Sequence, residues 1–452
     1  MMNSNNKPVI EFINHASVLI SNNEISLLSD PWFQGDAFHK GWNLLHELND
    51  AEIKEVLYKT SHIWISHEHP DHFSISFFIK FSDILHEREI QILFQKTLDK
   101  RVENFLRAKG FNVKILETNK WIELSKNFKI LNFKDGFYDS GLKMEVSGRR
   151  FLNLNDCEIK SKSRCAEVLD IVGECDVLLS QFSYAAWKGG KSNISWRKSA
   201  AKEKLETLSL QVKYFKPKVL IPFASFIYFS NTENFYLNDS ANTPQSVIDY
   251  FSDYNDVSIK IMRPFEKLQN FSLTKHSNTN SLDFWRDSYL SIQNKDKNTF
   301  EIKDLDVLNS SFQDYQIRVF NNNSKLFIKL IRLFSPIPAF KKITIYLSDL
   351  NENVMVDLFS HQITVTKKDP EISMTSESLD FIFKNTFGFD TLTVNGCFEE
   401  LKKGSFTKMV RTLAIENLNN IGISLNFLIF FRIDLIYLFL KRLFIVAKKI
   451  ET

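Results

Sequence analysis

The chain has 452 residues, of which 44% are apolar and 25% charged, and this balance excludes a disordered chain and predicts a protein with a buried core. Its 57 basic and 54 acidic side chains leave a net charge of only +3, so no strong field favours nucleic acid as a partner. The length predicts two domains.

The N-terminal region is predicted to be rich in strands. Residues 18–20 and 25–28 flank Asn22-Asn23, which is a good hairpin turn because Asn tolerates positive φ. The second strand leads directly into Asp30-Pro31. Asp30 therefore follows a strand, where it either orients a ligand or begins an ordinary Asp-Pro turn.

A cluster of histidines follows the next strand. Residues 61–66 alternate as a short strand does, and His67, His69, Asp71 and His72 then form the pattern His-x-His-x-Asp-His. Imidazole nitrogen and carboxylate oxygen hold zinc, iron or manganese, and an acidic residue between histidines allows two metals to share the cluster. The pattern predicts a metal site, and the alternative is a polar loop with surface histidines.

No histidine stands between His86 and His276, so further ligands from the middle of the chain must be carboxylates, a cysteine, amides or water. A hairpin predicted over residues 142–154 has Asp139 before it and Asp156 after it. We expect Asp139 and Asp156 to complete the metal site, with Asp156 as a bridge between two metals. The alternative role of each is a turn residue at a strand end.

The second half of the chain has a different pattern of predicted elements and contains the expected domain boundary. A helix is predicted over residues 200–214 and a buried strand over 218–222, and the polar stretch 277–281 marks a domain boundary. The predicted domains are 1–270, which carries the metal site, and 282–452. The second is predicted to be a small α+β module with strands near 343–347 and 362–365 and a helix over 376–386.

The C-terminal segment is strongly apolar. Residues 417–431 carry no charge, and the apolar run 435–440 follows. Because about 20 residues are needed to span a bilayer, two alternatives remain: a buried or partner-packing helix, or a helix lying in a membrane interface. In the second, the headgroups would meet Lys441, Arg442, Lys448 and Lys449. With four dispersed cysteines and no signal peptide, the expected location is cytoplasmic, with peripheral contact to the inner membrane face under the second alternative.

The cluster from His67 to His72 resembles the signature of the metallo-β-lactamase superfamily. Residues 14–17, 28–47, 139–157 and 221–230 further resemble the CMP-N-acetylneuraminate hydroxylases, over most of 10–265. The resemblance implies an α/β fold of the αββα sandwich type. It implies two divalent metal ions, with iron expected first and zinc or manganese as alternatives, and these ligands: His67, His69, Asp71, His72, Asp139 and Asp156.

The chain departs from those hydroxylases in three ways. They begin with a Rieske iron–sulfur domain, whereas no cysteine of this sequence has a histidine within three residues. Electrons would therefore come from an external reductase or ferredoxin. Phe137-Tyr138 and Asn231 stand where the pattern of the family has histidines.

Four further residues are candidates for orienting ligands or contacting substrate: His15, Trp32, Trp42 and Asn231. The alternative for the histidine is a structural side chain whose ring nitrogens are hydrogen-bonded within the fold. For the tryptophans the alternative is packing in the core.

Three functions remain open. The first is oxygen-dependent hydroxylation of a carbohydrate or nucleotide sugar. The second is hydrolysis of an ester, amide or phosphodiester, and in both Asp71 and Asp156 are the candidate catalytic residues. The third is a degenerate scaffold that binds sugar or lipid.

Overall fold

The computed structural model describes residues 7–335 and 337–431, and the chain divides into two compact units. The first unit comprises the chain up to Thr299 together with Val394–Gly396, and the second comprises Phe300–Thr393 and the chain from Cys397 onward. Each unit contains a sheet with its own buried apolar side chains.

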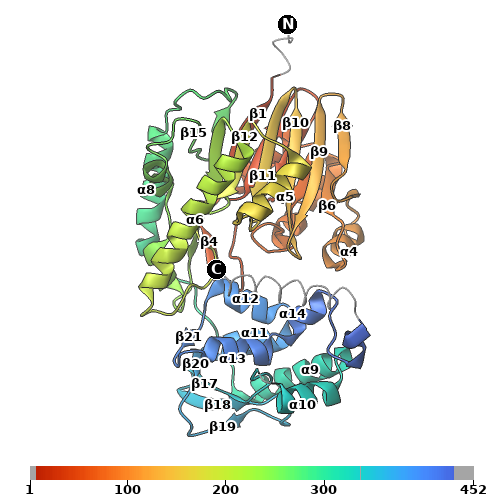
Figure 1. Cartoon of the computed structure of the whole chain (residues 1–452), viewed down its shortest axis with the longest axis vertical. Coiled ribbons are helices and arrows are strands. Elements are labelled where there is room, and N and C mark those ends of the chain that lie inside the picture. The colour runs from red at the N-terminus through yellow and green to blue at the C-terminus, as the bar shows by residue number, and fades with distance from the viewer. Residues whose placement is uncertain (1–6, 336, 432–452) are drawn as a thin grey trace, which may run out of the picture. The chain divides into compact units, whose positions relative to one another are not determined.

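Two seven-stranded sheets build the first unit (Figure 1). In spatial order, the first sheet contains β16 (Lys267–Leu268), β1 (Val9–Asn14), β2 (Ser17–Ser21), β3 (Ser26–Ser29), β5 (His62–Ile65), β6 (Gln91–Gln95) and β7 (Val113–Leu116). The second contains β15 (Ser258–Ile259), β13 (Val219–Phe223), β12 (Val177–Gln181), β11 (Arg149–Asn155), β10 (Asp139–Val146), β9 (Phe128–Asp135) and β8 (Trp121–Ser125). A separate ribbon pairs β4 (Trp42–Leu44) with β14 (Ile227–Phe229).

Each sheet combines an antiparallel part with a parallel part. In the first sheet β1, β2 and β3 are antiparallel, while β3, β5, β6 and β7 are parallel. In the second, β8 to β11 are antiparallel, while β11, β12, β13 and β15 are parallel. Because parallel neighbours end at the same edge, the loops after β3 and β5 emerge together.

The main core lies between the two sheets. Trp64 of β5 points inward, where its indole N–H donates to Asn132 Oδ1 of the second sheet at 3.4 Å. Its neighbours Ile63 and Ile65 point to the outer face and pack with the helices there, as the alternation of a strand requires.

Helices cover the outer faces of both sheets. Those on the first sheet are α1 (Asp50–Lys59), α2 (Ile75–Lys80), α3 (Ser82–Glu87) and α4 (Arg101–Ala108). Helices α5 (Lys162–Val172) and α6 (Ile194–Phe215) lie over the second sheet (Figure 1). The unit also contains α7 (Pro244–Tyr250), α8 (Thr279–Ser291) and the 3₁₀ turns η1 (Phe235–Ser240) and η2 (Ile292–Asn294). This order of helix, sheet, sheet and helix is the αββα sandwich, so the expected fold class is confirmed.

Helix α8 packs in the first unit, although the predicted second domain began at residue 282. Trp285 is fully buried in the main core, where its ring stacks on that of Phe226 with centroids 3.9 Å apart. The units therefore divide at residue 299 instead.

The second unit is built on a five-stranded sheet. Its strands are β19 (Thr364–Val365), β18 (Glu352–Val356), β17 (Ile343–Leu347), β20 (Ile372–Met374) and β21 (Glu399–Glu400) in spatial order. Its helices are α9 (Leu305–Asn322), α10 (Lys325–Phe334), α11 (Ser376–Lys384), α12 (Gly388–Asn395, continuing into the segment of the first unit), α13 (Ser405–Leu413) and α14 (Ile415–Asn420), followed by the 3₁₀ turn η3 (Phe427–Phe431).

The apolar stretch 417–431 is not one helix. Helix α14 ends at Asn420, and Gly422 has a φ of 78°, which breaks the helix at a position where glycine carries no steric penalty. The run 435–440 and the basic residues Lys441, Arg442, Lys448 and Lys449 lie outside the described residues. Within residues 7–335 and 337–431, no helix combines the length and apolarity that crossing a bilayer requires.

Candidate metal centre

The loop from His67 to His72 leaves the carboxyl end of β5 beside that of β3. Asp30 follows β3 directly, and its N–H donates to the carbonyl oxygen of Trp64 at 2.9 Å. At the far end, Ser74 Oγ accepts from the N–H of Phe77 at 3.3 Å and caps α2. Regular elements thus hold both ends of the loop.

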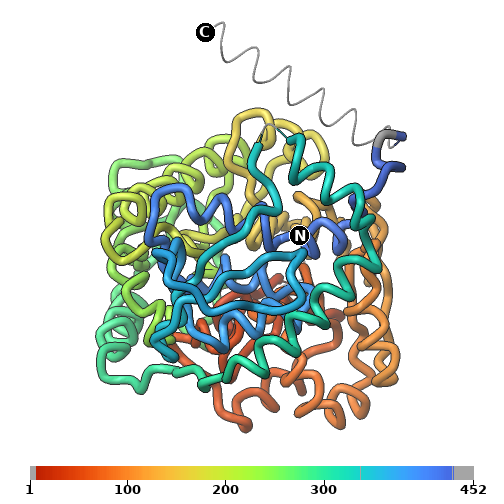
Figure 2. The backbone as a smooth tube through the Cα atoms, turned by 90° about the horizontal axis from the view of Figure 1, so that it is seen from below, coloured from red at the N-terminus to blue at the C-terminus, as the bar shows by residue number. Residues whose placement is uncertain are grey.

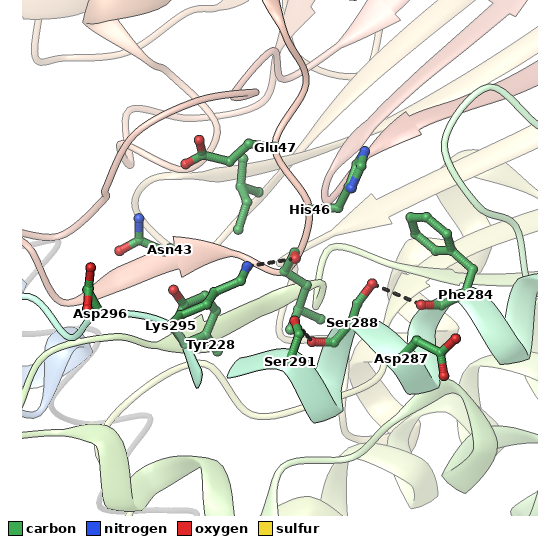
Figure 3. A pocket seen from close by; sticks show the side chains of 12 residues that line it. Asn43, His46, Glu47, Tyr228, Phe284, Asp287, Ser288, Ser291, Lys295 and Asp296 are labelled. Carbon is green, nitrogen blue, oxygen red and sulfur yellow. Dashed lines mark hydrogen bonds between the residues drawn. The ribbon is translucent and has the colours of Figure 1, made fainter. Parts of the chain in front are cut away.

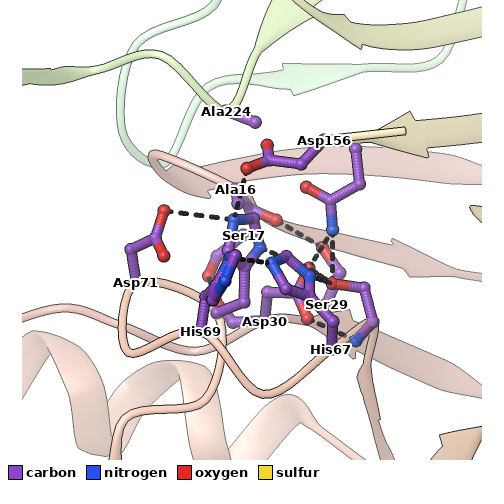
Figure 4. Close-up of polar contacts among 12 residues, drawn as sticks. Ala16, Ser17, Ser29, Asp30, His67, His69, Asp71, Asp156 and Ala224 are labelled. Atoms are coloured by element: carbon purple, nitrogen blue, oxygen red, sulfur yellow. Dashed lines mark hydrogen bonds and ion pairs between the residues drawn. The ribbon is translucent and has the colours of Figure 1, made fainter. Parts of the chain in front are cut away.

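Two carboxylates from the second sheet face this loop (Figure 4 shows Asp156). Asp139 begins β10, and its Oδ1 lies 3.7 Å from His67 Nε2. Asp156 directly follows β11, and its Oδ2 lies 3.4 Å from His72 Nε2. The cluster therefore spans the facing edges of both sheets.

The imidazoles converge on one another and on Asp71. His67 Nε2 lies 2.9 Å from His69 Nδ1, and the rings of His67 and His72 have centroids 4.2 Å apart. Asp71 Oδ2 lies 3.1 Å from His72 Nε2 and 3.3 Å from His15 Nε2. His15, a candidate for ligand orientation, thus stands among the candidate ligands themselves.

Three groups of side chains each place their ligand atoms within 4.8 Å of one another: His67, His69 and Asp139; His67, His72 and Asp156; His15, Asp71 and His72. In the described chain the buried atom Asp71 Oδ1 has no hydrogen-bond partner, and His72 Nε2 faces the carboxylate oxygens of Asp71 and Asp156 at 3.1 and 3.4 Å. Burying a carboxylate oxygen without a partner is costly, and a divalent cation would satisfy Asp71 Oδ1 and also accept the lone pair of His72 Nε2. The donor set therefore fits two metal ions, and the group that contains Asp156 shares His67 with one of the other groups and His72 with the other.

Burial governs the protonation of the cluster. Burial and the neighbouring imidazoles hold the pKa of His67 well below its usual value, so its ring is neutral and can donate a lone pair. Burial also raises the pKa of Asp139 to about 7, with nearby carboxylates adding to the effect. Burial alone would lower the pKa of His72, but the carboxylates around it raise the value well above normal. The carboxylates thus favour positive charge beside His72.

Asp30 holds one candidate ligand in place. Its Oδ2 lies 3.0 Å from His72 Nδ1, and its carboxylate also accepts from Ser66 N at 2.7 Å and Ser66 Oγ at 2.8 Å. The Nδ2 group of Asn155 donates to the same Asp30 oxygen. Fixing the second ring nitrogen of a ligand histidine is how a supporting carboxylate sets its tautomer and orientation.

A second supporting chain lies behind Asp156. Gln181 Nε2 donates to Asp156 Oδ1 at 3.0 Å, and Lys204 Nζ donates to Gln181 Oε1. Burial lowers the pKa of Lys204, while the carboxylate of Asp156 opposes that shift. The roles of Asn155, Gln181 and Lys204 were not predicted from the sequence, where only the position of Asn155 beside Asp156 offered a signal.

Aromatic rings line the histidine side of the cluster. Trp32 packs edge-on against His15 with ring centroids 5.5 Å apart, and Phe38 packs likewise against His69 at 5.5 Å. Trp42 lies behind Phe38 at 4.5 Å and is buried. Trp32 therefore lies beside His15 at the candidate ligands, whereas Trp42 packs behind Phe38 and does not reach them itself.

Asn231 closes a turn. Its Oδ1 accepts from the N–H of Glu233 at 3.1 Å, and its Nδ2 donates to the carbonyl of Lys40 at 3.4 Å. None of these described partners belongs to the candidate ligands.

A separate cavity of about 680 Å³ lies beside β4 (Figure 3). Trp42 and Asn43 are adjacent and so point to opposite faces of the strand; Trp42 packs on Phe38, while Asn43 lines the cavity. Lys295 also lines it and donates to the carbonyl of Leu45 at 3.1 Å. Among the described residues that line this cavity, none is a candidate metal ligand.

No protein-family model matches the chain. Its sequence is similar to cytidine monophosphate-N-acetylneuraminic acid hydroxylases. It is 26% identical to that of Danio rerio, over 52% of this chain and 41% of the relative. It is also 26% identical to that of Asterias rubens, over 56% and 40%, and to the inactive human protein, over 56% and 52%. The resemblance found in the sequence is confirmed, and the match spans about half the length of these relatives or less.

Solved structures of similar fold include the diiron β-hydroxylase CmlA from Streptomyces venezuelae, with a TM-score of 0.42 and 13% identity over 59% of this chain and 54% of that one. They also include the metallo-β-lactamase fold protein YhfI from Bacillus subtilis, with a TM-score of 0.39 and 12% identity over 59% of this chain and all of that one.

Proposed function

We propose that the chain is a dinuclear metalloenzyme that hydroxylates a carbohydrate or nucleotide sugar with oxygen and electrons from an external donor. The observation that carries this proposal is the linkage of three ligand groups through the shared residues His67 and His72, in a chain whose relatives are named as hydroxylases. A set of three or four imidazoles and three carboxylates suits iron at least as well as zinc.

The proposed ligands divide between two positions. His67, His69 and Asp139 would hold one ion, and Asp71, His72 and His15 the other, with Asp156 shared. Two bound irons would supply oxygen activation when a reductase or ferredoxin delivers electrons.

The residues of the chain hold and shield the reacting groups. Asp30 fixes the orientation of His72, and Gln181 fixes that of Asp156. The rings of Trp32 and Phe38 exclude water from the histidine side, which strengthens electrostatic interactions within the site. Asp71 and Asp156 would be the carboxylates that accept or return a proton.

The alternative function is hydrolysis of an ester, amide or phosphodiester, for which bound zinc or manganese would supply an activated water and Asp71 would accept its proton. The same ligand geometry supports it, but it has no counterpart in the names of the sequence relatives. A degenerate scaffold is the third function, and the unpartnered buried oxygen Oδ1 of the candidate ligand Asp71 speaks against it.

Metal content and oxygen dependence decide among the three. We expect the purified protein to hold about two irons and to turn over only with oxygen and a reductant, as a dinuclear oxygenase requires. If the protein is active with zinc or manganese under strict anaerobiosis, hydroxylation is excluded and hydrolysis becomes the supported function. If the protein binds no metal and added metal leaves its stability unchanged, the degenerate scaffold is the only one of the three functions that remains.

A substitution at the cluster tests the site separately from the reaction. We expect His69→Ala to lose metal and activity while circular dichroism stays unchanged, because the ring is only partly buried. His361→Ala, which alters an exposed histidine of the second unit, is the matched control and should keep both. Full metal content in His69→Ala would exclude His69 as a ligand.

A further inference from the structure

Helix α10 of the second unit carries apolar side chains on two faces. Phe327 and Ile328 are buried, whereas Leu326, Leu333 and Phe334 are 60%, 62% and 77% exposed. A surface helix ordinarily turns charged and polar side chains to water. The exposed apolar face of α10 therefore indicates an interaction surface.

The turn η3 lies beside this helix and extends its apolar face. The rings of Phe327 and Phe427 pack with centroids 4.9 Å apart, and the N–H of Ser324 donates to the carbonyl of Leu425 at 2.9 Å. Figure 2 shows the dark-blue end of the described chain close to the blue-green helices that precede it.

Two further exposed side chains come from η3 and one from the residues after α10. Leu428 and Phe431 are 69% and 79% exposed, and Ile337 is 53% exposed. We name the following six residues the α10–η3 surface: Leu326, Leu333, Phe334, Ile337, Leu428 and Phe431. Such a concentration is unusual for a face that meets only water.

Uncompensated positive charge borders the α10–η3 surface. Lys325 and Lys329 are exposed on α10, and within the described chain neither forms a salt bridge. Arg332 of the same helix differs, because its guanidinium pairs with Asp357 at 2.6 Å. The ammonium group of Lys325 lies over the ring of Phe320 at 5.1 Å, which leaves its charge unneutralised, so both ammonium groups favour an anionic partner.

The chain that follows the α10–η3 surface has the same character. Residues 432–452 come directly after Phe431 and contain five basic side chains (Arg432, Lys441, Arg442, Lys448, Lys449) and two acidic ones (Asp434, Glu451), which gives a net charge of +3. This segment also contains the apolar run 435–440. The charges of this segment and those of Lys325 and Lys329 favour the same anionic partner.

We propose that the α10–η3 surface binds an anionic lipid bilayer without crossing it. The six apolar side chains would enter the boundary between headgroups and acyl chains, while Lys325 and Lys329 would meet the lipid phosphates. Stable peripheral binding needs an apolar contact combined with a basic patch, and this surface supplies both. The proposal is independent of the reaction at the metal centre.

Vesicle cosedimentation of the full chain tests the proposal. We expect binding to vesicles of equal parts phosphatidylcholine and phosphatidylglycerol, weaker binding to phosphatidylcholine alone, and loss of binding as salt screens the charges. Leu333→Ser/Phe334→Ser and Lys325→Glu/Lys329→Glu should each weaken binding to the mixed vesicles about tenfold or more. Leu98→Ser/Leu273→Ser, which removes side chains 88% and 53% exposed in the first unit, is the matched control and should bind as the unaltered chain does.

Circular dichroism of each variant establishes that it has folded before its binding is compared. Equal binding by the folded Leu333→Ser/Phe334→Ser variant would overturn the proposal and assign any binding to other residues. Self-association in sedimentation velocity that this variant abolishes, without vesicle binding by the unaltered chain, would overturn it in favour of a second copy of the chain.

Discussion

Asp30 connects the two sheets at the candidate metal centre through three partners. Its carboxylate meets the ring of His72, the backbone and hydroxyl of Ser66, and the amide of Asn155. It is 1% exposed, so each of these contacts forms away from water, where hydrogen bonds to a charged group are strong.

We predict that Asp30→Asn lowers metal affinity about 10- to 100-fold, because an amide is a weaker acceptor for the His72 ring and brings its own N–H₂ group toward Ser66. Metal titration followed by competition with a chelator measures the change, and the melting temperature reports any loss of fold. Asp170→Asn, at an exposed position of α5, should leave affinity unchanged. Unaltered affinity in Asp30→Asn would mean that Asp30 only shapes its turn.

Spacing along the chain explains which residues of this centre were predictable. His67, His69, Asp71 and His72 stand within six residues, so their pattern carries the chemistry by itself. Asn155 reaches Asp30 across 125 positions, and Lys204 reaches Gln181 across 23. Amides and lysines are common in any sequence, and only the folded sheets bring these together.

At the level of elements, α8 departs most from the predicted domain boundary, since it packs in the first unit. The polar run before it resembles a linker in sequence, yet Asn278 is bound on both sides: its Oδ1 accepts from Ile261 N at 2.9 Å, and its Nδ2 donates to Ile259 O at 3.0 Å. Polar residues that satisfy backbone groups cannot be told from a linker by composition alone. The period-2 pattern of the hairpins was recoverable because each strand has one face on the core.

We predict that Trp285→Ala destabilises the first unit by about 3–5 kcal/mol, because it removes a buried ring from the core. The ring stacks on Phe226, and its indole N–H donates to the carbonyl of Met262 at 2.9 Å. Denaturant unfolding measures the loss, and Trp121→Ala, whose side chain is 45% exposed on β8, should cost far less. Equal losses in the two variants would show that α8 contributes little to this core.

Over the whole molecule, the two units differ in what they can bind. Among the described residues, all three candidate groups of metal ligands lie in the first unit. The second unit has its own buried sheet face, which includes Ile343, Ile345 and Val354. Units with separate cores need not unfold as one, and a ligand stabilises only the unit that binds it.

Calorimetry should therefore resolve two transitions, of which only one responds to metal. A metal at 100 times its dissociation constant adds about 2.7 kcal/mol to the stability of the binding unit, which raises its melting temperature by roughly 5 °C. Trp285→Ala should lower the metal-sensitive transition, and Leu379→Ala, which empties a buried position of α11, should lower the other. If metal instead shifted both transitions equally, or if one transition covered the whole chain, the two units would be coupled in unfolding, because stabilising one would then stabilise the other.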